Sequence, residues 1–242
     1  MFNKVKNWSK NRFKVLLSLA VIGATFTLTS CLDDDNNTPL PPAGYVLIYH
    51  GSPDAPDTDI YADQNKVNNF PISYTQGLSY SPFYIGERTF KFTNVNSLSS
   101  FLQKDFMVKA DSVYSLFLVN NFDNVDAIMI PDNWGETTNE TSQFRLVNIS
   151  PDAGSVSLEI TGENTDIVTD LASLESSDFQ EMESGVYDFV VKSTTSGETL
   201  VSATDIELRG NRIYTLILRG LVSATDEKTK LDLQLVTNYT NF

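Results

Sequence analysis

The sequence predicts an all-β protein that contains two tandem antiparallel β-sandwich domains of the immunoglobulin-like type. Apolar residues alternate with polar ones along several segments, for example at Val156, Leu158 and Ile160. This period of two is typical of half-buried strands, and no long stretch has helical spacing. Turn signals such as Ser-Pro-Asp, Ser-Gly and Pro-Asp-Asn recur about every ten residues, which favours a sandwich over a parallel sheet with crossover helices.

The strands expected in the first half of the chain follow from this alternation. They cover residues 45–50, 58–62, 89–94, 106–110, 114–121 and 126–130. Between 70 and 86 the sequence contains Pro71, Gly77, Pro82 and Gly86, residues that interrupt strands, so no regular strand is expected there.

An internal repeat predicts the number of domains. Ser52-Pro53-Asp54-Ala55 recurs as Ser150-Pro151-Asp152-Ala153, and the apolar segment around Tyr114 recurs around Tyr214, at separations of 98 and 100 residues. Matched blocks in the same order, with small slips, are typical of a duplicated domain. We therefore expect one sandwich over 45–131, a linker over 132–142 that is polar apart from Trp134, and a second sandwich over 143–242.

The N-terminal segment is typical of a signal peptide. It has five basic residues, an apolar stretch over 15–28 that is too short for a stable membrane span, and small residues before Cys31. It resembles the signal of bacterial lipoproteins. That resemblance implies removal of residues 1–30 and attachment of acyl chains to Cys31; the alternatives are a plain membrane anchor or a secretory signal without lipid. Cys31 is the only cysteine, so no disulfide is expected.

Residues 31–44 are expected to form a tether. Three aspartates, Asp33 to Asp35, follow the cysteine closely, and three prolines come after them, a composition that favours an extended chain. The acidic run resembles the export signal of Bacteroidetes surface lipoproteins. This resemblance implies an outer-membrane, lipid-anchored protein exposed at the cell surface; the alternative is a solvated spacer on a protein that faces the periplasm.

The charge of the chain argues against nucleic acid as a partner. The formal net charge is −14, and without the five basic residues of the leader 12 basic side chains remain against 31 acidic ones, a net charge of −19. A negative protein repels anionic polymers and has no basic cluster to release their counterions.

The first repeat resembles a known family. The segment His50-Gly51-Ser52-Pro53-Asp54-Ala55-Pro56, followed by Asp59-Ile60-Tyr61, is similar to the start of the domain of unknown function 4397. The second repeat is similar too, although Asn148, Gly154 and Ser157 replace His50, Pro56 and Asp59. The resemblance implies a secreted or surface-anchored β-sandwich module, and it implies no particular activity.

The Ser-Pro-Asp-Ala motif has a structural and a functional interpretation. Serine and aspartate side chains stabilise turns, and proline presets the backbone, so the motif is expected to shape a loop. The functional alternative is a Ca²⁺ site formed by Asp54, Asp57, Asp59 and Asp63, because calcium binds several oxygen ligands. The spacing matches no known calcium motif, and the second repeat keeps only Asp152.

The sequence favours a protein that is not an enzyme. His50 is the only histidine. Its ring nitrogens are expected to form hydrogen bonds with the backbone of the adjacent turn. The chain has no zinc motif, phosphate loop or nucleophile elbow, so the main enzyme classes lack their residues. A glycoside hydrolase needs only two carboxylates and stays as a less favoured alternative.

Aromatic residues supply the remaining functional hint. Tyr74, Tyr80, Phe83, Tyr84 and Trp134 either fill the core and the domain junction or form a ligand platform. The expected function is a non-catalytic binding or adhesion module for a glycan or a surface protein. The alternative is a structural or accessory envelope lipoprotein without a small ligand.

Overall fold

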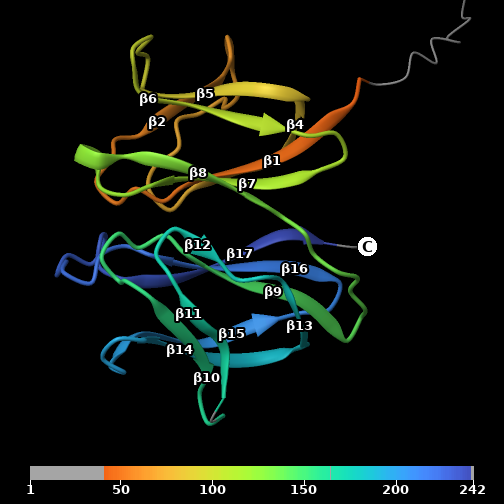
Figure 1. Ribbon diagram of the computed structural model, residues 1–242, viewed down its shortest axis with the longest axis vertical. Helices are drawn as coiled ribbons and strands as arrows, with labels where there is room; N and C mark the ends of the chain where they lie inside the picture. The colour runs from red at the N-terminus through yellow and green to blue at the C-terminus, as the bar shows by residue number, and fades with distance from the viewer. Residues whose placement is uncertain (1–40, 164, 241–242) are drawn as a thin grey trace, which may run out of the picture. The chain divides into compact units, whose positions relative to one another are not determined.

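The computed structural model describes residues 41–163 and 165–240, so the predicted signal peptide, Cys31 and most of the tether lie outside the described residues. The described chain is built from β-strands, with one short 3₁₀ turn, η1 (Phe122–Asn124), and no α-helix (Figure 1). In this part of the chain no helix is long and apolar enough to cross a membrane. The all-β prediction is confirmed.

The first half of the described chain forms two four-stranded sheets. Their strand orders are β4-β1-β7-β8 and β3-β2-β5-β6. The strands are β1 (Ala43–His50), β2 (Thr58–Ala62), β3 (Asn65–Lys66), β4 (Gly77–Tyr84), β5 (Gly86–Asn94), β6 (Ser100–Val108), β7 (Val113–Val119) and β8 (Asp126–Pro131). Between the sheets lies a core that includes Ile48, Ile60, Phe90, Phe92 and Leu116.

The second half repeats this arrangement. Its sheets are β12-β9-β16-β17, in which β13 also pairs with β9, and β11-β10-β14-β15. The strands are β9 (Thr141–Asn148), β10 (Val156–Ile160), β11 (Asp166–Leu171), β12 (Glu175–Ser176), β13 (Gln180–Glu183), β14 (Gly185–Ser193), β15 (Thr199–Leu208), β16 (Arg212–Arg219) and β17 (Asp232–Thr240). A separate core includes Phe144, Leu158, Phe189, Val191 and Leu216.

One strand pair in each half departs from the antiparallel prediction. β1 pairs with β7 in parallel, with Val46 opposite Tyr114, and β9 pairs with β16 in parallel, with Phe144 opposite Tyr214. Between β1 and β7 the chain passes through β2 and β3 of the other sheet, through β4 at the edge of the first sheet, and through β5 and β6 of the other sheet. Alternation of apolar residues reports which face is buried and is the same for either direction, so the sequence pattern could not reveal this pairing.

Strand β4 corrects a second expectation. Gly77 and Pro82 were expected to prevent a regular strand, yet both lie within β4, where Pro82 is opposite Tyr45 and Gly77 is opposite Tyr49. β4 is at the edge of its sheet, and an edge strand tolerates proline because one of its sides needs no ladder hydrogen bonds. Gly77 is required by close approach, since a Cβ atom there would lie 2.7 Å from the carbonyl oxygen of Ile48.

We call the sheets β4-β1-β7-β8 and β12-β9-β16-β17 the inner sheets. Each of them has an apolar cluster on both faces. The side chains of Val46 and Ile48 enter the first core, whereas those of Leu47 and Tyr49 belong to a third apolar cluster. That cluster joins the two halves through Leu47, Tyr49, Phe117, Val119, Val147, Ile149 and Ile217. The chain from Pro41 onward accordingly forms one compact unit.

A buried polar network accompanies this apolar contact. Arg145 Nη2 of β9 forms an ion pair with Asp132 Oδ1 at 2.6 Å, and both side chains are inaccessible to solvent. Asp132 also accepts a hydrogen bond from Ser115 Oγ at 2.7 Å, and Arg145 Nε donates to Thr215 Oγ1 at 3.1 Å. Asp132 belongs to the predicted linker, which therefore contributes a buried contact between the halves.

Candidate functional site

The Ser-Pro-Asp-Ala motif fastens one loop to another in each half. Its serine hydroxyl donates to a backbone carbonyl in the loop after β7 or β16, and its aspartate accepts a backbone N–H in the same loop. The bonds are Ser52 Oγ to Asn120 O at 2.5 Å, Ser150 Oγ to Gly220 O at 2.7 Å, Phe122 N to Asp54 Oδ1 at 2.7 Å and Val222 N to Asp152 Oδ1 at 2.8 Å. These contacts agree with the structural interpretation of the motif.

The structure does not bring the four aspartates of the proposed cation site together. Asp54 accepts the N–H of Phe122, Asp57 is exposed, and Asp59 is buried with Lys66 Nζ at 2.8 Å from its carboxylate. Burial acts to raise the pKa of Asp59, but Lys66 and the N–H of Asn96 hold it below its ordinary value. Among the described residues no group of three or more possible ligands is placed to hold a metal ion.

The five aromatic residues proposed as a platform do not form one common surface. Tyr74 is buried with its ring 6.5 Å from that of His50, and Phe83 packs in the first core at 5.3 Å from Phe90. Tyr80 and Trp134 pack at the junction of the halves, 6.1 Å apart. Tyr84 differs from the others, because 66% of it is exposed.

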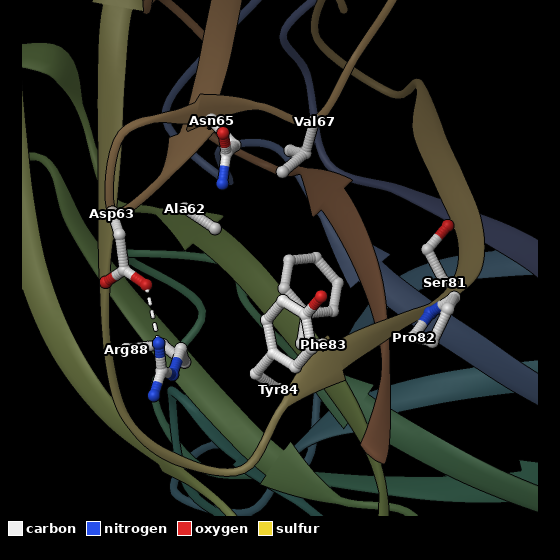
Figure 2. A pocket seen from close by; sticks show the side chains of 9 residues that line it. All are labelled: Ala62, Asp63, Asn65, Val67, Ser81, Pro82, Phe83, Tyr84 and Arg88. Atoms are coloured by element: carbon white, nitrogen blue, oxygen red, sulfur yellow. Dashed lines mark hydrogen bonds and ion pairs between the residues drawn. The ribbon is translucent and has the colours of Figure 1, made fainter. Parts of the chain in front are cut away.

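Tyr84 lies in a pocket of about 260 Å³ that we call the β3–β4 pocket. The pocket opens between the edge strands of the two sheets of the first half. Its lining residues are Ala62, Asp63, Asn65, Val67, Ser81, Pro82, Phe83, Tyr84 and Arg88. Figure 2 shows the Asp63–Arg88 pair on one side, Ser81 and Pro82 on the other, and the rings of Phe83 and Tyr84 between them.

Local backbone geometry places the charged pair of the pocket. Asp63 has a φ of 55° in the turn between β2 and β3, a left-handed conformation that aspartate adopts more readily than most residues. Gly86, the first residue of β5, has a φ of 103°, which a residue with a Cβ atom rarely adopts. The two turns bring Arg88 Nη1 to 2.8 Å from Asp63 Oδ2.

Backbone groups fix this ion pair further. The N–H of Thr89 donates to Asp63 Oδ1 at 3.0 Å, and Arg88 Nη2 donates to the carbonyl oxygen of Ile85 at 2.9 Å. The hydrogen bond from the Thr89 N–H and, to a smaller extent, the charge of Arg88 hold the pKa of Asp63 below its ordinary value. The carboxylate is therefore ionised at neutral pH. The pair is neutral as a whole and presents hydrogen-bond donors and acceptors beside an exposed aromatic ring.

The chain is similar to a family without an assigned activity. Residues 44–159 match the family model described as Domain of unknown function (DUF4397). The match supports the resemblance found in the first repeat. No curated protein matches the sequence. Among solved structures, the chain is similar to the fimbrial anchor protein Mfa2 from Porphyromonas gingivalis, with 8% identity and a TM-score of 0.21 over 82% of this chain and 100% of that one.

The DUF4397 match includes every residue that lines the β3–β4 pocket and ends within β10. Phe83, Tyr84 and Asp63 of this pocket were candidates from the sequence, whereas Asn65 and Arg88 were not. Arg88 lies 25 residues from Asp63 along the chain and reaches it because β2 pairs with β5, with Ala62 opposite Phe90. If the register of β2 against β5 had been known, it would have placed Arg88 close to Asp63 and so identified it as a pocket residue.

Proposed function

We propose that the protein is a lipid-anchored module of the outer membrane, displayed at the cell surface, that binds a glycan without catalysis. The anchor is Cys31, by its place after an apolar leader and by the absence of any other cysteine. Two or more acyl chains on this residue suffice for stable membrane attachment. The ligand site is the β3–β4 pocket.

The observation that carries the glycan assignment is the exposed ring of Tyr84 beside the fixed Asp63–Arg88 pair. A pyranose has an apolar face of C–H groups, which stacks on an aromatic ring, and hydroxyl groups that both donate and accept hydrogen bonds. Asp63 supplies acceptors, Arg88 supplies donors, and the amide of Asn65 supplies both. The volume of about 260 Å³ suits one sugar residue rather than a large ligand.

The charge of the site indicates an uncharged sugar. The Asp63–Arg88 pair contributes no net charge, and the chain as a whole is strongly acidic. An anionic sugar would meet a repulsive field without a free cation to offset it. We therefore expect neutral pyranoses to bind and uronic acids to bind more weakly.

The pocket lacks the groups for glycoside hydrolysis. Hydrolysis of a glycosidic bond needs two carboxylates on opposite sides of the bond, and Asp63 is the one carboxylate that lines this pocket. Thr89 and Arg88 also keep Asp63 ionised. A general acid must carry a proton at the working pH, so Asp63 is a poor candidate for that role. These features support binding without turnover.

The test is a titration of the purified full chain with methyl glucopyranoside, galactopyranoside and mannopyranoside, followed by saturation-transfer NMR and calorimetry. We expect at least one pyranoside to bind and the variant Tyr84→Ala to lose that binding. Tyr45→Ala is the matched control, because Tyr45 is also exposed and does not line the pocket. Equal loss in both variants, or no binding of any pyranoside, would contradict the proposal.

The second candidate function is a structural or accessory role in the envelope. The buried Arg145–Asp132 pair and the apolar cluster between the inner sheets favour it, since they join the halves into one unit that could act as a spacer. This role needs no ligand. A chain that binds no pyranoside but co-purifies with a defined envelope complex would favour it over the first.

A further inference from the structure

The β3–β4 pocket lies at the end of the first half at which the chain enters β1. Ala43, the first residue of β1, is opposite Tyr84, and Gly44 is opposite Phe83. The N–H of Asp111, in the turn before β7, donates to the carbonyl oxygen of Ala43 at 3.0 Å and fixes this point of entry. The ligand site is thus directly beside the attachment of the tether.

The tether limits the distance of the pocket from the membrane. Eleven residues lie between Cys31 and Ala43, and a fully extended chain over this segment reaches about 40 Å at most. If Cys31 carries the lipid, as the proposed function holds, the entry end of the first half is always within this reach of the bilayer. Glycans attached to the same membrane are therefore close to the pocket.

Two exposed apolar side chains lie next to pocket residues in the chain or in the sheet. Ile85 follows Tyr84 directly and is 40% exposed, and Met107, opposite Glu87 in the β5–β6 pair, is 54% exposed. Tyrosine is common at membrane–water interfaces, where its ring contacts apolar groups and its hydroxyl contacts water. The combination of a sugar-sized pocket and adjacent apolar side chains matches a molecule with both a sugar and a lipid portion.

We propose that the β3–β4 pocket binds the sugar of a glycolipid in the leaflet that holds Cys31. Asp63, Arg88 and Asn65 bond the sugar hydroxyls, Tyr84 stacks on the sugar, and Ile85 and Met107 contact the boundary between the sugar and the acyl chains. Tethering raises the effective concentration of such a ligand to about the millimolar range, so an open pocket with weak intrinsic affinity becomes occupied. Binding would hold the entry end of the protein against the membrane.

This inference rests on the proposed function, and the test separates the two. The lipidated full chain is reconstituted into phosphatidylcholine vesicles, with or without glycosyl diacylglycerols that carry glucose, galactose or mannose. A fluorescent methyl pyranoside of the same three sugars reports whether the pocket is free. We expect glycolipid in the vesicles to weaken the apparent binding of one soluble pyranoside by about tenfold, as effective concentrations in the millimolar range predict.

Variants identify the contribution of each part. Met107→Glu should reduce this competition by the glycolipid and leave binding of the soluble pyranoside unchanged. Leu98→Glu is the control, because Leu98 is 96% exposed in the β5–β6 turn, at the opposite end of the first half. Arg88→Met should abolish both kinds of binding.

Three outcomes would overturn the inference. If soluble pyranosides bind through Tyr84 but glycolipid does not compete, the ligand is a soluble glycan, and the proposed function stands without the further inference. If glycolipid competes equally in the Met107→Glu and wild-type chains, the apolar contact is wrong. If no pyranoside binds at all, the proposed function fails together with the inference.

Discussion

His50 and Asn148 make the same hydrogen bond at equivalent positions of the two halves. His50 Nε2 lies 3.2 Å from the carbonyl oxygen of Pro56, and Asn148 Nδ2 lies 2.9 Å from that of Gly154. Because a carbonyl oxygen only accepts, Nε2 of His50 carries the proton, and the buried Nδ1 has no hydrogen-bond partner. The histidine therefore shapes a loop, as the sequence interpretation held, and asparagine does the same in the second half.

The first prediction concerns the pH dependence of stability. Burial lowers the pKa of His50 below its ordinary value, so the unfolded state binds a proton at a higher pH than the folded state does. The free energy of unfolding should accordingly fall as the pH drops through about 6.5, by up to about 1.4 kcal/mol per pH unit. His50→Asn should remove this slope, because His50 is the only histidine. Urea unfolding between pH 5.5 and 8 tests the prediction, and identical slopes in both chains would refute it.

The second prediction concerns the buried pair between the halves. Arg145→Met leaves the Asp132 carboxylate buried without its cation and should lower the free energy of unfolding by about 3–5 kcal/mol. The double variant Arg145→Met with Asp132→Asn should recover part of that loss, because the uncompensated charge is removed. Chemical denaturation of the wild-type chain, the two single variants and the double variant measures the effect. A double variant as unstable as the sum of the two single ones would show that the charges do not act as a pair.

The third prediction separates folding from binding at two adjacent residues. Phe83→Ala removes a ring that packs against Phe90 in the core and should destabilise the protein by about 3–5 kcal/mol. Tyr84→Ala truncates an exposed side chain and should change stability by less than about 0.5 kcal/mol. Thermal unfolding measures both variants. A large destabilisation by Tyr84→Ala would assign its ring to the fold and weaken its assignment to the ligand site.

The fourth prediction concerns calcium. Asp54, Asp59 and Asp63 each have their own hydrogen-bond or ion-pair partner, and Asp57 is exposed. Millimolar Ca²⁺ and a chelator should therefore give the same unfolding temperature for the purified full chain. A rise with Ca²⁺ that disappears with the chelator, and that is absent with Mg²⁺, would show that a calcium site exists despite this geometry.

Three strands were predicted with close bounds. The expected range 58–62 coincides with β2, and 45–50 and 126–130 fall within β1 and β8. β4 was missed because Gly77 and Pro82 are unfavourable in most strands, and the sequence did not show that this one lies at a sheet edge. Of the pocket residues, Phe83 and Tyr84 were found as aromatic candidates, but the sequence could not tell which ring is buried, since the two are adjacent.

The sequence alone determined the all-β character, the positions of most strands and the shared loop motif, because these depend on residues close together in the chain. It also supplied the prediction of a lipid on Cys31, which stays a prediction. The tertiary structure decided which strands are neighbours, the parallel pairing of β1 with β7, and the separation of the four aspartates. It also brought Asp63, Arg88 and Tyr84 into one pocket. Such contacts depend on strand register and on sheet edges, and alternation of apolar residues specifies neither.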